Sequence, residues 1–212
     1  MTSLRPDYNR FGQVCTSLLD VNHRARGLDI EFQKLISENL MLRLFYELDR
    51  VIEPIALKLI TGTPYLDGST PTLLVPRFVS QDAAKRYILA ALSTRRRTVY
   101  YMEWTMLAKA QANLNGILAP ADHFLTTRSL HDATYEEMRF VRNHIAHNSA
   151  STRAKFAGVS RRIYGTTRGI TPAKLLLSQR AAVPGYIGRE AAVVQYVKWS
   201  RTFLKTLTKS PV

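Results

Sequence analysis

The residues best suited to chemistry lie in one short stretch, EEMRFVRNHIAHNSAS, which covers residues 136–151. Successive residues of an α-helix are about 100° apart, so Arg142, Asn143 and His147 would share one helix face. An imidazole exchanges a proton near neutral pH, and a guanidinium binds phosphate oxygens in pairs. We therefore expect RNA cleavage without a metal ion. His147 would transfer the proton, Arg142 would stabilise charge on the phosphoryl oxygens, and Asn143 would orient the imidazole or the phosphate.

The rest of this stretch is compatible with an amphipathic helix. Met138, Val141 and Ile145 fall on the face opposite Arg142, which predicts that this side is buried. Arg139 falls on the polar face and His144 at its boundary. A solvent-exposed face of an ordinary helix is the alternative interpretation, because Arg, Asn and His are common on such faces.

The run from Arg142 to His147, RNHIAH, resembles the signature of the HEPN superfamily. HEPN proteins are helical domains, and their ribonuclease members carry Arg, often followed by Asn, His or Asp, and then His after four to six residues. The resemblance implies that Arg142 and His147 are catalytic and that Asn143 supports them. It also implies a homodimer in which two copies of the motif face each other. The family role would be that of a toxin or a phage-defence effector, with an antitoxin or defence-system partner.

HEPN toxins paired with a nucleotidyltransferase antitoxin commonly have Tyr two residues after the motif His. Ser149 stands there, so that form of regulation is not expected.

The charge of the chain is concentrated in its C-terminal part. The net charge is +14, and residues 138–212 hold 14 Lys and Arg but only one acid, Glu190. Such one-sided charge is typical of a protein that binds a polyanion, and we expect RNA. A membrane is disfavoured because the cations do not lie on one amphipathic helix. The alternatives are a basic surface without a partner and a helical DNA-binding protein. The predicted RNA-binding residues are Arg139, Arg153, Lys155, Arg161, Arg162 and Arg168.

Apolar periodicity predicts an all-α fold, a bundle of four to five helices. Helices are expected at 28–61, at 80–94, from 99 to 113 or 116, at the motif, and at 190–207. Residues 1–212 would form a single HEPN-like domain. Residues 152–188 are rich in Gly, Thr and Arg, and we expect a basic insertion of loops there, with a β-hairpin as one option. Tyr164 and Tyr186 would be available in it for stacking on bases.

Local signals predict where several of these helices begin and end. Ser80 would be the N-cap of the helix at 80–94, and Thr134 with Glu137 would form a capping box at the start of the motif helix. Pro54 would kink or split the long early helix. The segment 61–71, TGTPYLDGSTP, reads as a loop, as does LAPADHF at 118–124. Arg95–Arg97 would mark a helix end or turn.

The remaining features limit the possible classes of protein. The single cysteine, Cys15, excludes an internal disulfide, and no apolar run approaches the length of a membrane span. The N-terminal sequence is too polar for a signal peptide, so we expect a soluble, cytoplasmic protein. No His or Cys spacing indicates a metal site and no cofactor is expected; His123 reads as structural. Ser37, Glu38 and Asn39 on the early helix could reach the motif. Besides a nuclease, a non-catalytic RNA-binding or adaptor HEPN protein fits the same sequence.

Overall fold

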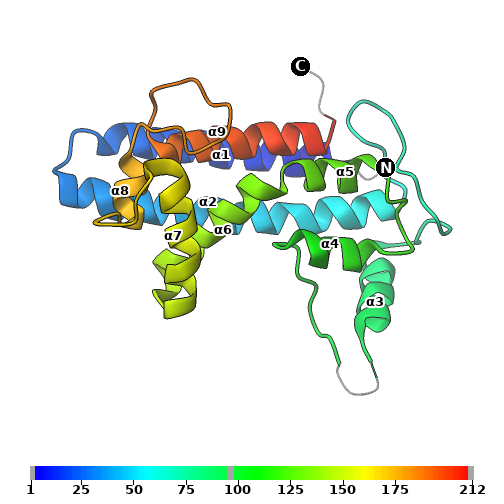
Figure 1. The fold of residues 1–212 in the computed structure, drawn as a ribbon. Helices are drawn as coiled ribbons and strands as arrows, with labels where there is room; N and C mark the ends of the chain where they lie inside the picture. Colours follow the sequence, from blue (N-terminus) through cyan, green and yellow to red (C-terminus); the bar gives the residue numbers. More distant parts are fainter. Residues whose placement is uncertain (1–2, 95–97, 210–212) are drawn as a thin grey trace. The chain divides into compact units, whose positions relative to one another are not determined.

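The structure is a computed structural model that describes residues 3–94 and 98–209. All regular elements in these residues are helices, apart from an isolated bridge between Leu73 and Leu118 (Figure 1). The prediction of an all-α protein is therefore confirmed, although the helices outnumber the expected four or five. In chain order they are α1 (Arg5–Ala25), α2 (Ile30–Ile60), α3 (Gln81–Leu92), α4 (Leu107–Leu114), α5 (His123–Leu130), α6 (Asp132–His147), α7 (Ala150–Tyr164), α8 (Pro172–Leu177) and α9 (Ala192–Leu207).

The contacts divide the chain into two compact units. One contains the described parts of Met1–Arg10, Asp49–Asp132 and Phe203–Val212, and the other contains Phe11–Leu48 and Ala133–Thr202. The second unit holds nearly all of the motif helix α6 and the whole of α7 and α8. The candidate site is therefore a property of the second unit.

The core of the second unit forms where the apolar faces of four helices meet. Leu44 on α2 and Met138 and Val141 on α6 are fully buried. The rings of Phe45 and Tyr135 meet edge to face with their centroids 5.3 Å apart. Burial of this apolar area is the main force that holds α6 in place. Further buried side chains come from α1 and α9: Phe11, Cys15, Leu18, Val193, Tyr196 and Val197.

The first unit is held by apolar packing and by ion pairs between its helices. Ile52, Ile55 and Leu59 on α2 are fully buried. The Lys58 ammonium lies 2.5 Å from the Asp7 carboxylate, and that pair joins α2 to α1. The α3 helix is joined to α2 in the same way, by Lys85 and Glu53 at 2.9 Å.

Several predicted elements are confirmed. The early helix is α2, residues 61–71 lie outside helices, and the last predicted helix is α9. The Ser80 side chain accepts a hydrogen bond from the Ala83 N–H at 3.1 Å and so caps α3 as expected. The predicted split at Pro54 is wrong, because α2 continues through it. Burial of the neighbouring Ile52 and Ile55 offsets the cost of proline within the helix.

Other boundaries were predicted wrongly. The helix expected from 99 is only α4, which begins at Leu107, and the expected LAPADHF loop runs into α5, which has Asp122 as its N-cap. Thr134 is not a cap: α6 begins at Asp132, and Thr134 is buried inside it. The α1 helix was not predicted. Arg95–Arg97 lie outside the described residues.

The basic segment after the motif is not a run of loops. Residues 150–164 form α7, which has a capping box of Ser149 and Thr152, and residues 172–177 form α8. Phe156, Val159 and Ile163 supply α7 with a buried face, and the helix ends at Gly165, whose φ of 74° suits glycine. The optional β-hairpin is absent from the described residues of 152–188. Between α6 and α7 the chain turns at Asn148, which has a φ of 40°.

No helix in the described part of the chain is long and apolar enough to cross a membrane.

Candidate functional site

The α6 helix presents the motif as the sequence predicted. Its buried face includes Tyr135, Met138 and Val141, and the Ser200 hydroxyl approaches the Met138 sulfur at 4.0 Å. These contacts fix the rotation of the helix about its axis. Arg142 and Asn143 consequently lie half-buried at the surface, and His147 lies exposed at the last position of the helix.

The Arg142 side chain is oriented by its neighbour. Its Nη1 donates a hydrogen bond to the Asn143 Oδ1 at 2.9 Å. The described residues supply no other hydrogen-bond or ion-pair partner to this guanidinium, so its remaining N–H groups can bind an anion. Asn143 thus contacts the guanidinium, a partner that differs from the imidazole or phosphate expected from the sequence.

His147 lies at the turn between two helices. Asn148, in the left-handed region, ends α6, and Ser149 caps α7. The His147 imidazole is exposed and has no hydrogen-bond partner within residues 3–94 and 98–209. It can therefore meet a ligand, but none of the residues that the structure describes orients it.

Two of the predicted RNA-binding arginines are engaged in ion pairs. The Arg139 Nη2 lies 2.8 Å from the Glu136 carboxylate, and only 13% of the Arg139 side chain is exposed. Arg162 donates from Nε and Nη2 to the two carboxylate oxygens of Glu137 and also to the Ala182 carbonyl oxygen. Arg162 therefore ties α7 to α6 and to the segment before α9, and it is poorly placed to bind RNA.

The other predicted cations are exposed. The Lys155 ammonium lies 5.6 Å from the centre of the Phe140 ring, and Arg153 lies one turn into α7. Arg161 and Arg168 have exposed side chains without partners in the described residues. These four side chains are accessible to a ligand, and their role in RNA binding stays a prediction.

The two tyrosines expected to stack on bases are used within the fold. The Arg180 guanidinium lies 4.7 Å from the centre of the Tyr164 ring and covers one face of it. The Tyr186 hydroxyl donates a short hydrogen bond to the Glu190 carboxylate. That hydrogen bond raises the pKa of Tyr186 to about 12, with burial contributing. One face of the Tyr164 ring and the hydroxyl of Tyr186 are therefore engaged within the fold, and stacking of either ring on a base stays a prediction.

A hollow of about 640 Å³ lies at the end of α6, beside the motif. His144 and Asn148 from α6, Arg153 and Phe156 from α7, and Glu38 from α2 contribute to its walls. Glu38 was weakly predicted to reach the motif region, and the structure brings it there. Its neighbours are used locally: the Ser37 hydroxyl donates to the Lys34 carbonyl oxygen, and the Asn39 amide donates to the Leu35 carbonyl oxygen.

His144 was not predicted as a site residue, because its angle placed it at the boundary of the polar face. Its ring is stacked on Phe156, with centroids 4.8 Å apart and planes at 25°. Burial lowers the pKa of His144, and the nearby Arg153 charge lowers it further. The position of His144 depends on Phe156, which lies on the next helix, α7. Helical periodicity within α6 could not reveal this contact between two helices.

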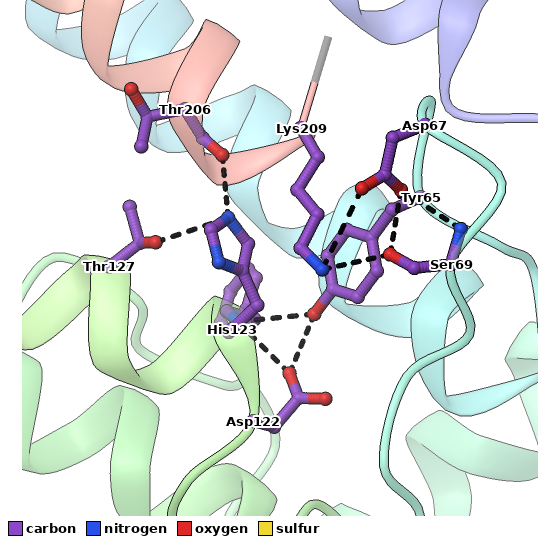
Figure 2. Close-up of polar contacts among 9 residues, drawn as sticks. Tyr65, Asp67, Ser69, Asp122, His123, Thr127, Thr206 and Lys209 are labelled. Atoms are coloured by element: carbon purple, nitrogen blue, oxygen red, sulfur yellow. Dashed lines mark hydrogen bonds and ion pairs between the residues drawn. The ribbon is translucent and has the colours of Figure 1, made fainter.

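A second polar cluster lies in the first unit, and Figure 2 shows its contacts. The Tyr65 hydroxyl donates to the Asp122 carboxylate at 2.6 Å, and burial with this bond raises the Tyr65 pKa. The His123 Nε2 lies 2.7 Å from the Thr206 carbonyl oxygen, and Lys209 lies 4.9 Å from the centre of the Tyr65 ring. Each of these groups has a partner within the fold, so the cluster ties the 61–71 loop and α5 to the end of α9. The interpretation of His123 as structural agrees with this arrangement.

The described residues contain no group of three or more His, Cys, Asp or Glu side chains that could hold a metal ion. No protein-family model matches the chain, and neither a curated protein nor a solved structure shows significant similarity to it.

Proposed function

We propose that this protein is a metal-independent endoribonuclease of the HEPN class. Arg142 and His147 are its catalytic residues, and Asn143 positions Arg142. The observation that carries the proposal is the exposed end of α6. There, Arg142 keeps guanidinium N–H groups for an anion and His147 keeps an imidazole for proton transfer. The RNHIAH sequence supports the assignment to this class.

The chemistry is cleavage by an internal nucleophile. The imidazole removes the proton of a ribose 2′-hydroxyl, and the resulting oxygen bonds to the adjacent phosphorus. The bond from phosphorus to the 5′-oxygen breaks, and that oxygen takes a proton from an acid. The products are a 2′,3′-cyclic phosphate, which water can open to a 3′-phosphate, and a 5′-hydroxyl. Arg142 stabilises the negative charge that builds up on the phosphoryl oxygens.

The reaction needs a base and an acid, and one chain supplies a single copy of His147 for these two roles. A homodimer would supply both, together with a second arginine. The proposal therefore includes self-association, in line with the family pattern. A role as a toxin or phage-defence effector, with an antitoxin or defence-system partner, belongs to the same proposal.

The charge distribution supports RNA as the substrate. Residues 138–212 carry 14 Lys and Arg against one acid. Arg153, Lys155, Arg161 and Arg168 are exposed on or near α7 and can contact phosphates. Such contacts bind the backbone without reading its sequence.

A non-catalytic RNA-binding or adaptor HEPN protein is the second candidate. The observation that favours it is the isolation of His147, which no described group orients. In that case the basic residues would bind RNA, and the motif would remain without an assembled site.

The test is incubation of the purified protein with RNA in EDTA, beside Arg142→Ala and His147→Ala. His23→Ala is the matched control, because His23 is also an exposed helical histidine but lies on α1. We expect cleavage with cyclic-phosphate ends by the wild type and the control. Each motif variant should lose activity by about 10²–10⁴-fold while it still binds RNA. RNA binding without cleavage by all four proteins would favour the second candidate.

A further inference from the structure

The hollow beside the motif has the size and the lining of a nucleotide-binding site. Its volume of about 640 Å³ lies in the range of small-molecule pockets. One part of the lining is apolar and includes Ile145, Ile170 and Pro172. The half-buried ring of His144, which is stacked on the buried Phe156, adds aromatic surface next to them. Proteins that recognise unpaired RNA stack the flat faces of its bases on aromatic side chains.

Glu38 places a carboxylate in the wall of this hollow. Its Oε1 accepts a hydrogen bond from the Ala173 N–H at 3.1 Å, which holds the side chain between α2 and the start of α8. A carboxylate only accepts hydrogen bonds, so it selects a ligand that offers donors. Guanine is the common base that offers adjacent N1–H and N2–H donors, which match the oxygens of a carboxylate. Adenine, cytosine and uracil each present a ring nitrogen or carbonyl acceptor beside their donor, which the carboxylate repels.

A cation lies at the same hollow. Arg153 contributes to its lining and is exposed, and its charge is felt by His144 across the gap between α7 and α6. A guanidinium in this position can bind a phosphate attached to a base in the hollow. Asn148, which follows His147 directly, is also part of the lining. A nucleotide bound here would therefore have its phosphate near the end of α6 that carries His147.

We propose that this hollow binds an unpaired guanine nucleotide of the RNA, with Glu38 reading the base and Arg153 binding its phosphate. The inference rests on the proposed function, and it specifies the nucleotide next to which the ribonuclease cuts. The His144 ring, backed by the buried Phe156, contacts the flat base, and the carboxylate distinguishes guanine from the other bases.

The test measures binding of GMP, AMP, CMP and UMP to the full chain by isothermal titration calorimetry in EDTA. We expect GMP to bind at least about tenfold more tightly than the others, since a bidentate contact to a base discriminates by about 1–3 kcal/mol. Glu38→Gln should remove this preference, because it lowers the affinity for GMP and also ends the repulsion between the carboxylate and the acceptors of AMP, CMP and UMP. Gln retains an oxygen that can accept from the Ala173 N–H, so the structural bond can persist in the variant. Glu31→Gln is the matched control, because Glu31 lies on the same helix, is exposed and does not line the hollow.

A second variant tests the phosphate contact without altering a buried group. Arg153→Ala should reduce the advantage of GMP over guanosine by about tenfold, since a charge-assisted contact is lost. Equal affinity for the four mononucleotides, or wild-type affinity of Glu38→Gln for GMP, would overturn the inference.

Mononucleotide binding does not depend on cleavage, so the two proposals can fail separately. RNA cleavage without a preference for GMP would retain the ribonuclease and remove the guanine site. Selective, Glu38-dependent binding of GMP by a protein that cleaves no RNA would retain the guanine site and remove the ribonuclease. Mapping of the cut ends supplies a further check, since the cuts should lie next to guanines in the wild type and lose that bias in Glu38→Gln.

Discussion

Arg161 and Arg162 are adjacent on α7, and the structure predicts that their replacement has different consequences. Arg161 is exposed and has no partner in the described residues, whereas Arg162 donates to the Glu137 carboxylate and to the Ala182 carbonyl oxygen. We expect Arg162→Met to destabilise the protein and Arg161→Met to weaken RNA binding. The sequence alone treats both as equivalent members of a basic run.

The magnitude follows from the burial of the ion pair. The side chains of Arg162 and Glu137 are 35% and 19% exposed, so the pair is neither a surface pair nor a fully buried one. Surface pairs contribute about 0–1 kcal/mol, and breaking a fully buried pair costs about 3–5 kcal/mol. Loss of the hydrogen bond to Ala182 adds about 1 kcal/mol. We therefore expect Arg162→Met to lower the free energy of unfolding by about 2–3 kcal/mol. Arg161→Met should change it by less than about 0.5 kcal/mol.

Two assays separate these effects. Urea denaturation of both variants, with Glu137→Gln and the double variant, measures stability, and the cycle should show a coupling of about 1–2 kcal/mol between Arg162 and Glu137. The number of phosphate contacts is obtained from the slope of the logarithm of the RNA-binding constant against the logarithm of the salt concentration. Arg161→Met should reduce the magnitude of this slope by about 0.7, which is the value for one contact to a single strand. The reasoning would be refuted if Arg162→Met reduced the salt slope and left stability unchanged, or if the cycle showed no coupling.

Three further predictions use other parts of the chain. Burial raises the pKa of the Cys15 thiol to about 12. In the native protein Cys15 should therefore react with a thiol reagent only as fast as the chain opens, and labelling at the rate of a free thiol would contradict this. The pKa of His144 in the folded protein lies below its ordinary value of 6.5. As the pH falls below about 6.5, His144 is therefore protonated in the unfolded chain before it is protonated in the folded protein. The unfolded chain then binds more protons, so the free energy of unfolding decreases. His144→Phe should reduce the loss of stability between about pH 6.5 and pH 5 measured by urea denaturation, and an unchanged loss would count against the assigned shift. Ser80→Ala removes the cap of α3 and should cost about 1 kcal/mol by thermal denaturation, whereas Ser80→Asp should retain most of the stability.

The parts of the fold that could be predicted from the sequence are those encoded by nearby residues. The apolar spacing of α2, α6 and α9 repeats every three or four residues, and the Ser80 cap acts within one turn of its helix. These signals depend only on residues close together in the chain, so they can be recognised without the tertiary structure. For the same reason Met138 and Val141 were correctly predicted to be buried and His147 to be exposed, whereas Ile145, expected on the buried face, is half-buried and lines the hollow.

The errors occurred where local signals are weak. The α7 helix contains Ser, Thr, Gly and several cations, a composition that suggested a loop, yet it is helical. Its side chains Phe156, Val159 and Ile163 are buried, and this burial requires the neighbouring helices of the folded protein. Tertiary packing of this kind overrides local propensity, because most of the stability of a helix in a protein comes from its buried face.

The sequence by itself determined that the protein is helical, that its positive charge is concentrated after residue 137, and that Arg142, Asn143 and His147 share a helix face. Only the tertiary structure decided which cations are available, because the partner of Arg162 is Glu137, 25 residues away in the chain. It also brought Glu38 to the hollow beside His144, through a contact with Ala173 that spans 135 residues. Such pairings depend on the arrangement of whole helices, and helical periodicity carries no information about which helix faces which.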